Sequence, residues 1–178
     1  KRTLGHSNSL TGEPMPHADP PAPPSTRQDL HFIHISDTHI GPTKEDRFLD
    51  VPTYARLRAI VDAINRLQVP VDFVIHTGDV VTDADNPASD EASTRLAHSL
   101  LKNLRHTLYV VNGNHDEIQY IDQYFGRGGC SPLGDDKKTR GYHFAHGNDR
   151  CIVLDARGSK QLDPAGLLSE TQLDAFDE

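Results

Sequence analysis

The segment VDFVIHTGD, residues 71–79, is a largely apolar run that ends in a glycine and a carboxylate. Short apolar runs of this kind are typical of buried strands, so we predict a strand from Val71 to about His76 that feeds a loop at Gly78 and Asp79. The segments LHFIHISD (30–37) and TLYVV (107–111) show the same pattern, each followed by polar residues. We therefore expect three short strands that each end in a polar loop.

The two segments between these strands have apolar residues at helical spacing. The first carries Tyr54, Leu57, Ile60, Val61, Ile64 and Leu67, with Pro52 near its start, where a missing N–H costs little. The second, about 89–105, carries Ala92, Leu96, Leu100 and Leu104. A β, α, β, α, β order predicts parallel strands with helices on the faces, which is an α/β fold.

The last third of the chain changes character. EIQYIDQYF (117–125) predicts a short helix, and RGGCSPLGDDKKTRG (127–141) is a connection rich in residues that break helices and strands. YHFA (142–145) and CIVLDA (151–156) predict an antiparallel pair joined by a turn at 146–149. In LLSETQLDAFDE (167–178), Ser169 and Gln172 match a capping box that opens a helix.

Residues 1–29 differ from the rest in composition. They hold half of the twelve prolines and little periodic apolar pattern, so we predict a disordered, proline-rich arm ahead of a folded domain over 30–178. The sequence begins at Lys1, and a targeting signal upstream of it would not be visible here.

Composition excludes several classes of protein. A length of 178 residues suits one domain, and a net charge of -8 makes a nucleic-acid partner unexpected. No apolar run approaches the roughly 20 residues that span a bilayer. The two cysteines, Cys130 and Cys151, are too few for a disulfide framework; as unpaired thiols they favour a reducing, cytoplasmic location.

Polar residues follow each of the three predicted strands: Asp37 and His39 after the first, Asp79 after the second, and Asn114, His115 and Asp116 after the third. The carboxyl ends of neighbouring parallel strands lie at one edge of a sheet, so these groups should converge. Carboxylate and imidazole ligands suit Mn, Fe, Zn or Co. We predict a two-metal centre in which Asp37 and His39 bind one ion, Asp79 bridges, and Asn114 binds the second.

His115 and Asp116 are expected beside the metals. His115 would bond the phosphoryl group without ligating an ion and would give a proton to the leaving oxygen. Asp116 would orient that imidazole or raise its basicity. An equally open alternative for Asp116 is a carboxylate at the N-terminus of the helix over 117–125.

The segments HISDTHIG, VIHTGDVVTD, VVNGNHD, CIVLDA and GLLSETQLDAF resemble the calcineurin-like metallophosphoesterases, specifically the branch with class III cyclic-nucleotide phosphodiesterases. The resemblance covers 30–178. It implies a four-layer α/β/β/α sandwich, two divalent or mixed-valence metal ions, a small phosphodiester substrate, and hydrolysis by metal-activated hydroxide. It also implies the same roles for Asp37, His39, Asp79, Asn114 and His115.

The sequence departs from the family pattern in one respect. Family members also use a histidine after a later strand and a Gly-His-x-His motif, whereas the histidines after Asp116 are His143 and His146, which we predict to be hairpin residues. We therefore expect these residues to form the N-terminal part of the domain, with its C-terminal part missing. On that expectation the chain alone binds metal poorly and hydrolyses little.

Other functions remain open. A non-catalytic binding or scaffold protein could keep the fold without the later ligands, and a nuclease of the same fold is disfavoured by the charge. Purple acid phosphatases use a metal-bound tyrosine shortly after the bridging aspartate. This chain has VVTDADN there, without a tyrosine, so that branch of the family is disfavoured. Substrate choice is expected to lie in the loops 41–52 and 127–141.

Overall fold

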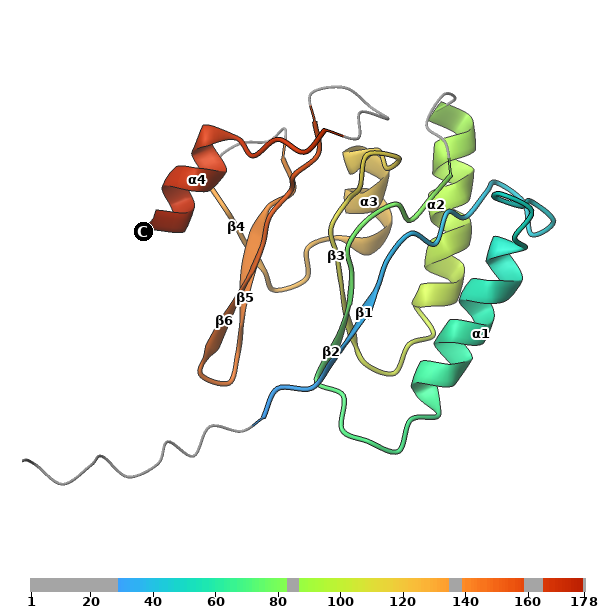
Figure 1. The fold of residues 1–178 in the computed structure, drawn as a ribbon, viewed down its shortest axis with the longest axis horizontal. Coiled ribbons are helices and arrows are strands. Elements are labelled where there is room, and N and C mark those ends of the chain that lie inside the picture. The colour runs from blue at the N-terminus through green and yellow to red at the C-terminus, as the bar shows by residue number, and fades with distance from the viewer. Residues whose placement is uncertain (1–28, 83–86, 135–138, 159–164, 178) are drawn as a thin grey trace, which may run out of the picture.

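The computed structural model describes residues 29–82, 87–134, 139–158 and 165–177, which form two three-stranded sheets and four helices. The predicted arm lies almost wholly outside the described residues. Figure 1 shows the first sheet between helices α1 and α2 on one side and the hairpin of the second sheet on the other. No helix in the described ranges is long and apolar enough to cross a membrane.

The first sheet is parallel, with the strand order β1-β2-β3. It consists of β1 (Phe32–Ile35), β2 (Phe73–His76) and β3 (Thr107–Val110), joined through α1 (Thr53–Asn65) and α2 (Pro87–Leu101). The predicted parallel β, α, β, α, β unit is therefore confirmed. After β3, the predicted short helix is also present as α3 (Ile118–Phe125).

The helices bury their apolar stripes against this sheet. Their shared core includes Leu57 and Val61 of α1, Leu100 and Leu101 of α2, and Ile121 of α3. Burial of each such side chain contributes on the order of 1.5–3 kcal/mol, so this layer contributes much of the stability that places the strand ends.

The ends of the helices differ from the predicted bounds. Helix α2 begins at Pro87, where proline's fixed φ suits a first helical position, and it ends at Leu101 instead of about 105. The Asn103 side chain donates to the carbonyl oxygens of Ser99 (2.8 Å) and Leu100 (3.0 Å) and thereby satisfies the last turn. Leu67, predicted to continue the stripe of α1, follows the helix and is 43% exposed.

The second sheet is antiparallel, with the order β4-β5-β6. The predicted pair is confirmed as β5 (Tyr142–His146) and β6 (Asp149–Val153), and Gly147 takes φ 58° in the turn between them. His143 and His146 both lie in β5, as expected. The strand β4 (Ser131–Pro132) was not predicted, because two residues with a proline give no periodic signal; proline is tolerated there since β4 is an edge strand.

A second core joins the two sheets. It consists of Phe73, Val111, Tyr142, Phe144 and Val153. The Tyr109 ring stacks on Phe144 with 3.6 Å between centroids. Helices, parallel sheet and antiparallel sheet thus make a mixed α/β arrangement. Both cysteines are free, as predicted.

The last helix, α4 (Glu170–Asp177), is held against the chain after β6 by the side chain of Gln172. Half of the predicted capping box is present, because the Gln172 amide donates to Ser169 Oγ (3.3 Å). The fully buried Gln172 side chain instead pairs with the backbone of Asp155: Oε1 accepts from its amide (2.9 Å) and Nε2 donates to its carbonyl (2.9 Å). A side chain predicted to cap the helix therefore docks it against the end of β6.

The guanidinium of Arg140 is buried between the two sheets and α3. Its Nε donates to Asp122 Oδ1 at 2.8 Å, and its terminal nitrogens donate to the carbonyl oxygens of Val110 and Gly126. Burial alone would raise the pKa of Asp122, but hydrogen bonds from Arg127 and Arg140 lower it. One side chain thus links the end of β3 to α3 and to Gly126, which follows α3.

Replacing Arg140 by methionine should remove about 1–3 kcal/mol from the free energy of unfolding, since the Gly126 carbonyl loses its donor. Among the described residues, the Asp122 carboxylate then keeps only Arg127, and the Val110 carbonyl keeps only the Tyr142 hydroxyl. Urea denaturation measures the change in the free energy of unfolding. The control is Arg150→Met, because Arg150 is exposed and its loss should stay within about 0.5 kcal/mol. Equal effects of the two substitutions would contradict the role assigned to Arg140.

Candidate metal centre

The loops after β1, β2 and β3 meet at one edge of the parallel sheet. The register aligns Ile35, His76 and Val110, so the three strands end level with one another. Beyond the strands, the His39 amide donates to the Asp79 carbonyl at 3.0 Å. One ligand atom from each of His39, Asp79 and His115 lies within 4.8 Å of the other two.

Asp37, His39 and Asp79 have left-handed backbone conformations, with φ of 55°, 44° and 53°. Such values are uncommon outside glycine and cost on the order of 1–3 kcal/mol each. Strain of this kind persists where the surrounding structure enforces it and is concentrated at functional sites. All three side chains are ones that the sequence predicted as metal ligands.

The distances from the His39 imidazole to the carboxylates of Asp37 and Asp79 suit ligands of one shared ion better than direct hydrogen bonds. Its Nε2 lies 3.8 Å from Asp37 Oδ1 and 3.9 Å from Asp79 Oδ2. These separations are too long for hydrogen bonds, but ligand atoms that each lie about 2.0–2.2 Å from a metal can be up to about 4 Å apart. His39 Nδ1 is buried and has no hydrogen-bond partner among the described residues.

Exposure differs among these groups. The Asp37 side chain is 66% exposed, whereas those of His39 and Asp79 are 10% and 17% exposed. The charge of Asp79 is therefore shielded least by water, and a cation beside it would interact with it strongly. The donor set of two carboxylates and an imidazole fits a divalent metal ion.

Ring contacts hold the His39 imidazole in place. Phe48 stacks on it with 4.0 Å between centroids and an interplanar angle of 15°. His115 meets it edge-on at 4.9 Å and 86°. Packing on a face and an edge restricts rotation, so His39 is pre-oriented toward the two aspartates.

His115 is tied to the loop after β2. Its amide donates to Asp79 Oδ1 at 3.2 Å, and its Nδ1 bonds the Thr82 carbonyl. A carbonyl oxygen only accepts, so Nδ1 carries a proton and Nε2 holds the lone pair when the ring is neutral. The sequence placed His115 beside the metals; the structure also gives it the position of a third donor in the cluster.

Asp116 is completely buried and connects two loops. Its carboxylate accepts from the amides of Val80 (3.2 Å), Val81 (3.0 Å) and Gly113 (2.8 Å). Burial raises its pKa to about 6 although these three bonds oppose the shift. None of the three bonds goes to α3, so they do not support the alternative of a carboxylate at the start of that helix.

Gly113 lets the two loops approach closely. A Cβ at this position would lie 2.1 Å from Asp79 Oδ1 and 2.4 Å from the Asp79 amide nitrogen. These are backbone and carboxylate atoms that cannot move away without displacing Asp79. The structure thus shows that a glycine is required here by contact with the predicted bridging ligand.

His76 and Thr38 join the loops after β1 and β2 by hydrogen bonds. The sequence analysis did not predict this role for either residue. The Gly78 amide donates to His76 Nδ1 (3.2 Å), so Nε2 carries the proton and donates to Thr38 Oγ1 (2.9 Å), which donates to the Val80 carbonyl (3.1 Å). Burial lowers the pKa of His76 to about 3, which keeps the ring neutral. A histidine ending an otherwise apolar strand was the available signal.

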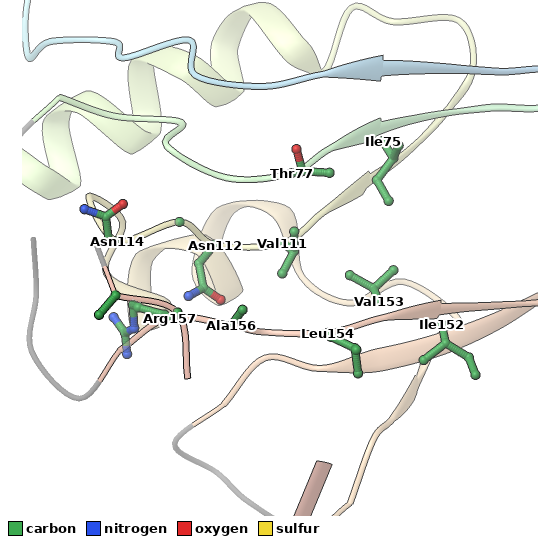
Figure 2. Close-up of a pocket in the computed structure, with 13 residues that line it drawn as sticks. Ile75, Thr77, Val111, Asn112, Asn114, Ile152, Val153, Leu154, Ala156 and Arg157 are labelled. Carbon is green, nitrogen blue, oxygen red and sulfur yellow. The ribbon is translucent and has the colours of Figure 1, made fainter. Parts of the chain in front are cut away.

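Asn114 lies between Gly113 and His115 and borders a cavity of about 390 Å³ on the other side of the loop. Figure 2 shows it near Asn112 and Arg157, which also line that cavity. Arg157 donates to the Asp116 carbonyl at 3.1 Å, and the buried Asn112 donates to Asp155 at 3.3 Å. Asn114 thus shares the loop of His115 but lines a cavity to which Asp37, His39, Asp79 and His115 do not contribute.

Comparison with known proteins gives a family match over most of the described chain. The sequence model of the calcineurin-like phosphoesterases matches residues 30–174. The glycerophosphodiester phosphodiesterase GpdQ of Enterobacter lignolyticus is 27% identical over 125 residues, which are 70% of this chain and 43% of that protein.

Two further relatives are named for other functions than the glycerophosphodiester phosphodiesterase. A probable cyclic nucleotide phosphodiesterase of Rhodopseudomonas palustris is 31% identical over 96 residues, 54% of this chain and 33% of that protein. The DNA double-strand break repair protein Mre11 of Methanocaldococcus jannaschii is 30% identical over 93 residues, 49% of this chain and 24% of that protein. The chain thus spans less than half the length of each of these relatives.

Gly113→Ala should lower the free energy of unfolding by about 1–3 kcal/mol, because the added methyl group forces the two loops apart. Urea denaturation measures the loss. Gly129→Ala is the matched control, since a Cβ at Gly129 meets no atom within 4 Å. A Gly113 variant as stable as the control would show that the loops can separate at no cost.

His76 should make stability fall in acid. The unfolded chain binds a proton at this residue near pH 6.5, but the folded chain does so only near pH 3. Its contribution is therefore complete above 6.5 and is lost as the pH falls from 6.5 toward 3. His76→Asn keeps an acceptor for the Gly78 amide without titrating, so its unfolding free energy should depend less on pH over that window; identical pH profiles would refute the assignment.

Proposed function

The chain belongs to the calcineurin-like phosphoesterase family, and on that premise we propose that it carries the first set of ligands of a two-metal phosphodiester hydrolase. The observation that carries the proposal is the convergence of His39, Asp79 and His115 within 4.8 Å at the carboxyl edge of the parallel sheet. The family's four-layer arrangement, of which the described chain has helices and two sheets, is part of the same proposal.

Each residue has a proposed role. Asp37 and His39 would hold one ion, Asp79 would bridge, and Asn114 would offer its side-chain oxygen to the second. Mn, Fe, Zn and Co suit this donor set. When bound, such ions supply Lewis acidity toward the phosphate ester and lower the pKa of water. A neutral amide as the fourth ligand limits negative charge where an anionic substrate must approach.

His115 would act on the phosphoryl group. Its Nδ1–H is held by the Thr82 carbonyl, which leaves Nε2 as the atom that would carry a proton to the leaving oxygen. Asp116 would act through the backbone, because its bonds to Val80, Val81 and Gly113 fix the distance between the loops of Asp79 and His115. It would therefore position His115 whether or not it contacts the imidazole.

Metal binding is the first test. Mn²⁺ added to the chain should broaden the NMR signals of His39, Asp79 and His115 ahead of others, and Asp79→Asn should weaken binding at least tenfold. Asp62→Asn is the control, because Asp62 is an exposed carboxylate on α1. Broadening centred elsewhere, or equal effects of the two substitutions, would refute the centre.

Activity separates the enzyme from its alternatives. With Mn²⁺ present, we expect slow hydrolysis of bis(p-nitrophenyl) phosphate that Asp79→Asn abolishes, since the family's later histidine ligands are absent from these 178 residues. Two tightly held metals with rapid turnover would contradict the incomplete site. Bound metal without turnover would favour the non-catalytic binding protein, and cleavage of DNA in preference to the small ester would favour a nuclease.

A further inference from the structure

A second cavity, of about 440 Å³, adjoins the candidate metal centre on the side of α1. Asp37 and His39 form the wall that it shares with the centre. The rest is mainly apolar and comes from the loop after β1 and from α1: Phe48, Leu49, Val51, Leu57 and Ile60. A group bound here would lie directly beside a phosphate held at His39.

Leu49, which lines this cavity, has an unfavourable backbone conformation. Phe48 and Val51 pair through both backbone bonds (3.0 and 2.8 Å), and the two residues between them, Leu49 and Asp50, have φ of 46° and 63°. Positive φ at both central positions is the type I′ turn, which strongly prefers asparagine and glycine. A leucine in this conformation is an outlier, because its bulk clashes with the backbone.

The Leu49 side chain is also 84% exposed, so no burial within the described residues offsets that strain. The turn is nevertheless held firmly. Arg47 donates to the Asp50 carbonyl, and Phe48 is stacked on His39. A strained, exposed leucine on a rigid support beside a reactive centre is the arrangement expected when an apolar group from outside completes the contact.

The polar groups of the cavity narrow the ligand class. Thr38 Oγ1 is engaged with His76 and the Val80 carbonyl. The remaining hydroxyl groups at the lining are those of Ser36 and the buried Thr53, and the charged groups are Asp37 and the exposed Arg56. A polyhydroxylated ester group would exchange water for few hydrogen-bond partners here, which is unfavourable. An aromatic group would gain contact with Phe48 and Leu49.

We infer that this cavity is the subsite for an aromatic ester group of the phosphodiester substrate, with Leu49 and Phe48 as the residues that select it. The inference rests on the proposed function, because it assumes a phosphoryl group held at His39 and Asp79. It assigns part of the specificity expected of the loop 41–52 to two residues.

The test compares diphenyl phosphate with dimethyl phosphate on the Zn²⁺-loaded chain. Diphenyl phosphate should bind more tightly, by about tenfold, and should shift the methyl signals of Leu49 and the ring signals of Phe48. Dimethyl phosphate should shift signals around His39 and leave those of Leu49 in place. Equal affinities, or shifts that spare Leu49, would overturn the inference.

Leu49→Asn separates ligand contact from turn formation. Asparagine suits a left-handed turn position, so the variant should melt no lower than the wild type while it loses the preference for diphenyl phosphate. Leu67→Asn, at another partly exposed leucine outside the cavity, is the control and should keep the preference. A Leu49 variant that melts lower and keeps the preference would mean that the leucine serves the turn.

Failure of the proposed function can be distinguished from failure of the subsite inference. If Zn²⁺ does not bind at His39 and Asp79, the hydrolase proposal fails. Adding phenol alone then tests whether the cavity binds an aromatic group. Shifts of the NMR signals of Leu49 and Phe48 that Leu49→Asn removes would support an aromatic subsite, and their absence would refute it.

Discussion

The candidate centre depends on one interaction, the bridge that the buried Asp116 carboxylate makes between the loops after β2 and β3. Three amides converge on this side chain, and two of them follow Asp79 directly in the chain. Without a partner, buried amides would each cost on the order of 1–3 kcal/mol. The contact that satisfies them also brings Gly113 against Asp79, so stability and the geometry of the centre are set by the same atoms.

The rest of the fold can be understood as support for this edge of the sheet. His76 and Thr38 fix the loop of Asp37 and His39 from below, while Arg140 fixes the end of β3 from the side of the second sheet. Left-handed conformations at Asp37, His39 and Asp79 need such support, because each would relax in a free loop. Among the described residues, the other left-handed conformations outside glycine are those of Leu49 and Asp50, in the turn beside the neighbouring cavity.

The sequence was sufficient for features that depend on local patterns. Apolar strands, amphipathic helices and polar strand ends predicted the parallel unit and the meeting of His39, Asp79 and His115, because the carboxyl ends of parallel strands share an edge. The hairpin followed from its turn residues. Polar motifs at three strand ends are informative for the same reason: topology alone brings them together.

Features that depend on long-range contacts were not predictable. Gln172 has the spacing of a capping residue, and only the position of Asp155 in space shows that it docks the helix instead. Asp116 gives no sign in the sequence that its partners are the amides of Val80 and Val81. The two-residue strand β4 is defined by its pairing with β5 and has no periodicity of its own.

His39 links the proposed metal centre and the neighbouring cavity. One face of its ring stacks on Phe48, which starts the turn of Leu49, and its Nε2 points toward Asp37 and Asp79. An ion that fixed the imidazole would also fix the Phe48 ring, and a group bound on Phe48 would restrict the same imidazole. By linkage, the two would strengthen each other's binding by the same factor. On the proposed function, this aromatic stack would therefore couple the shape of the bound ester group to the retention of the metal ion.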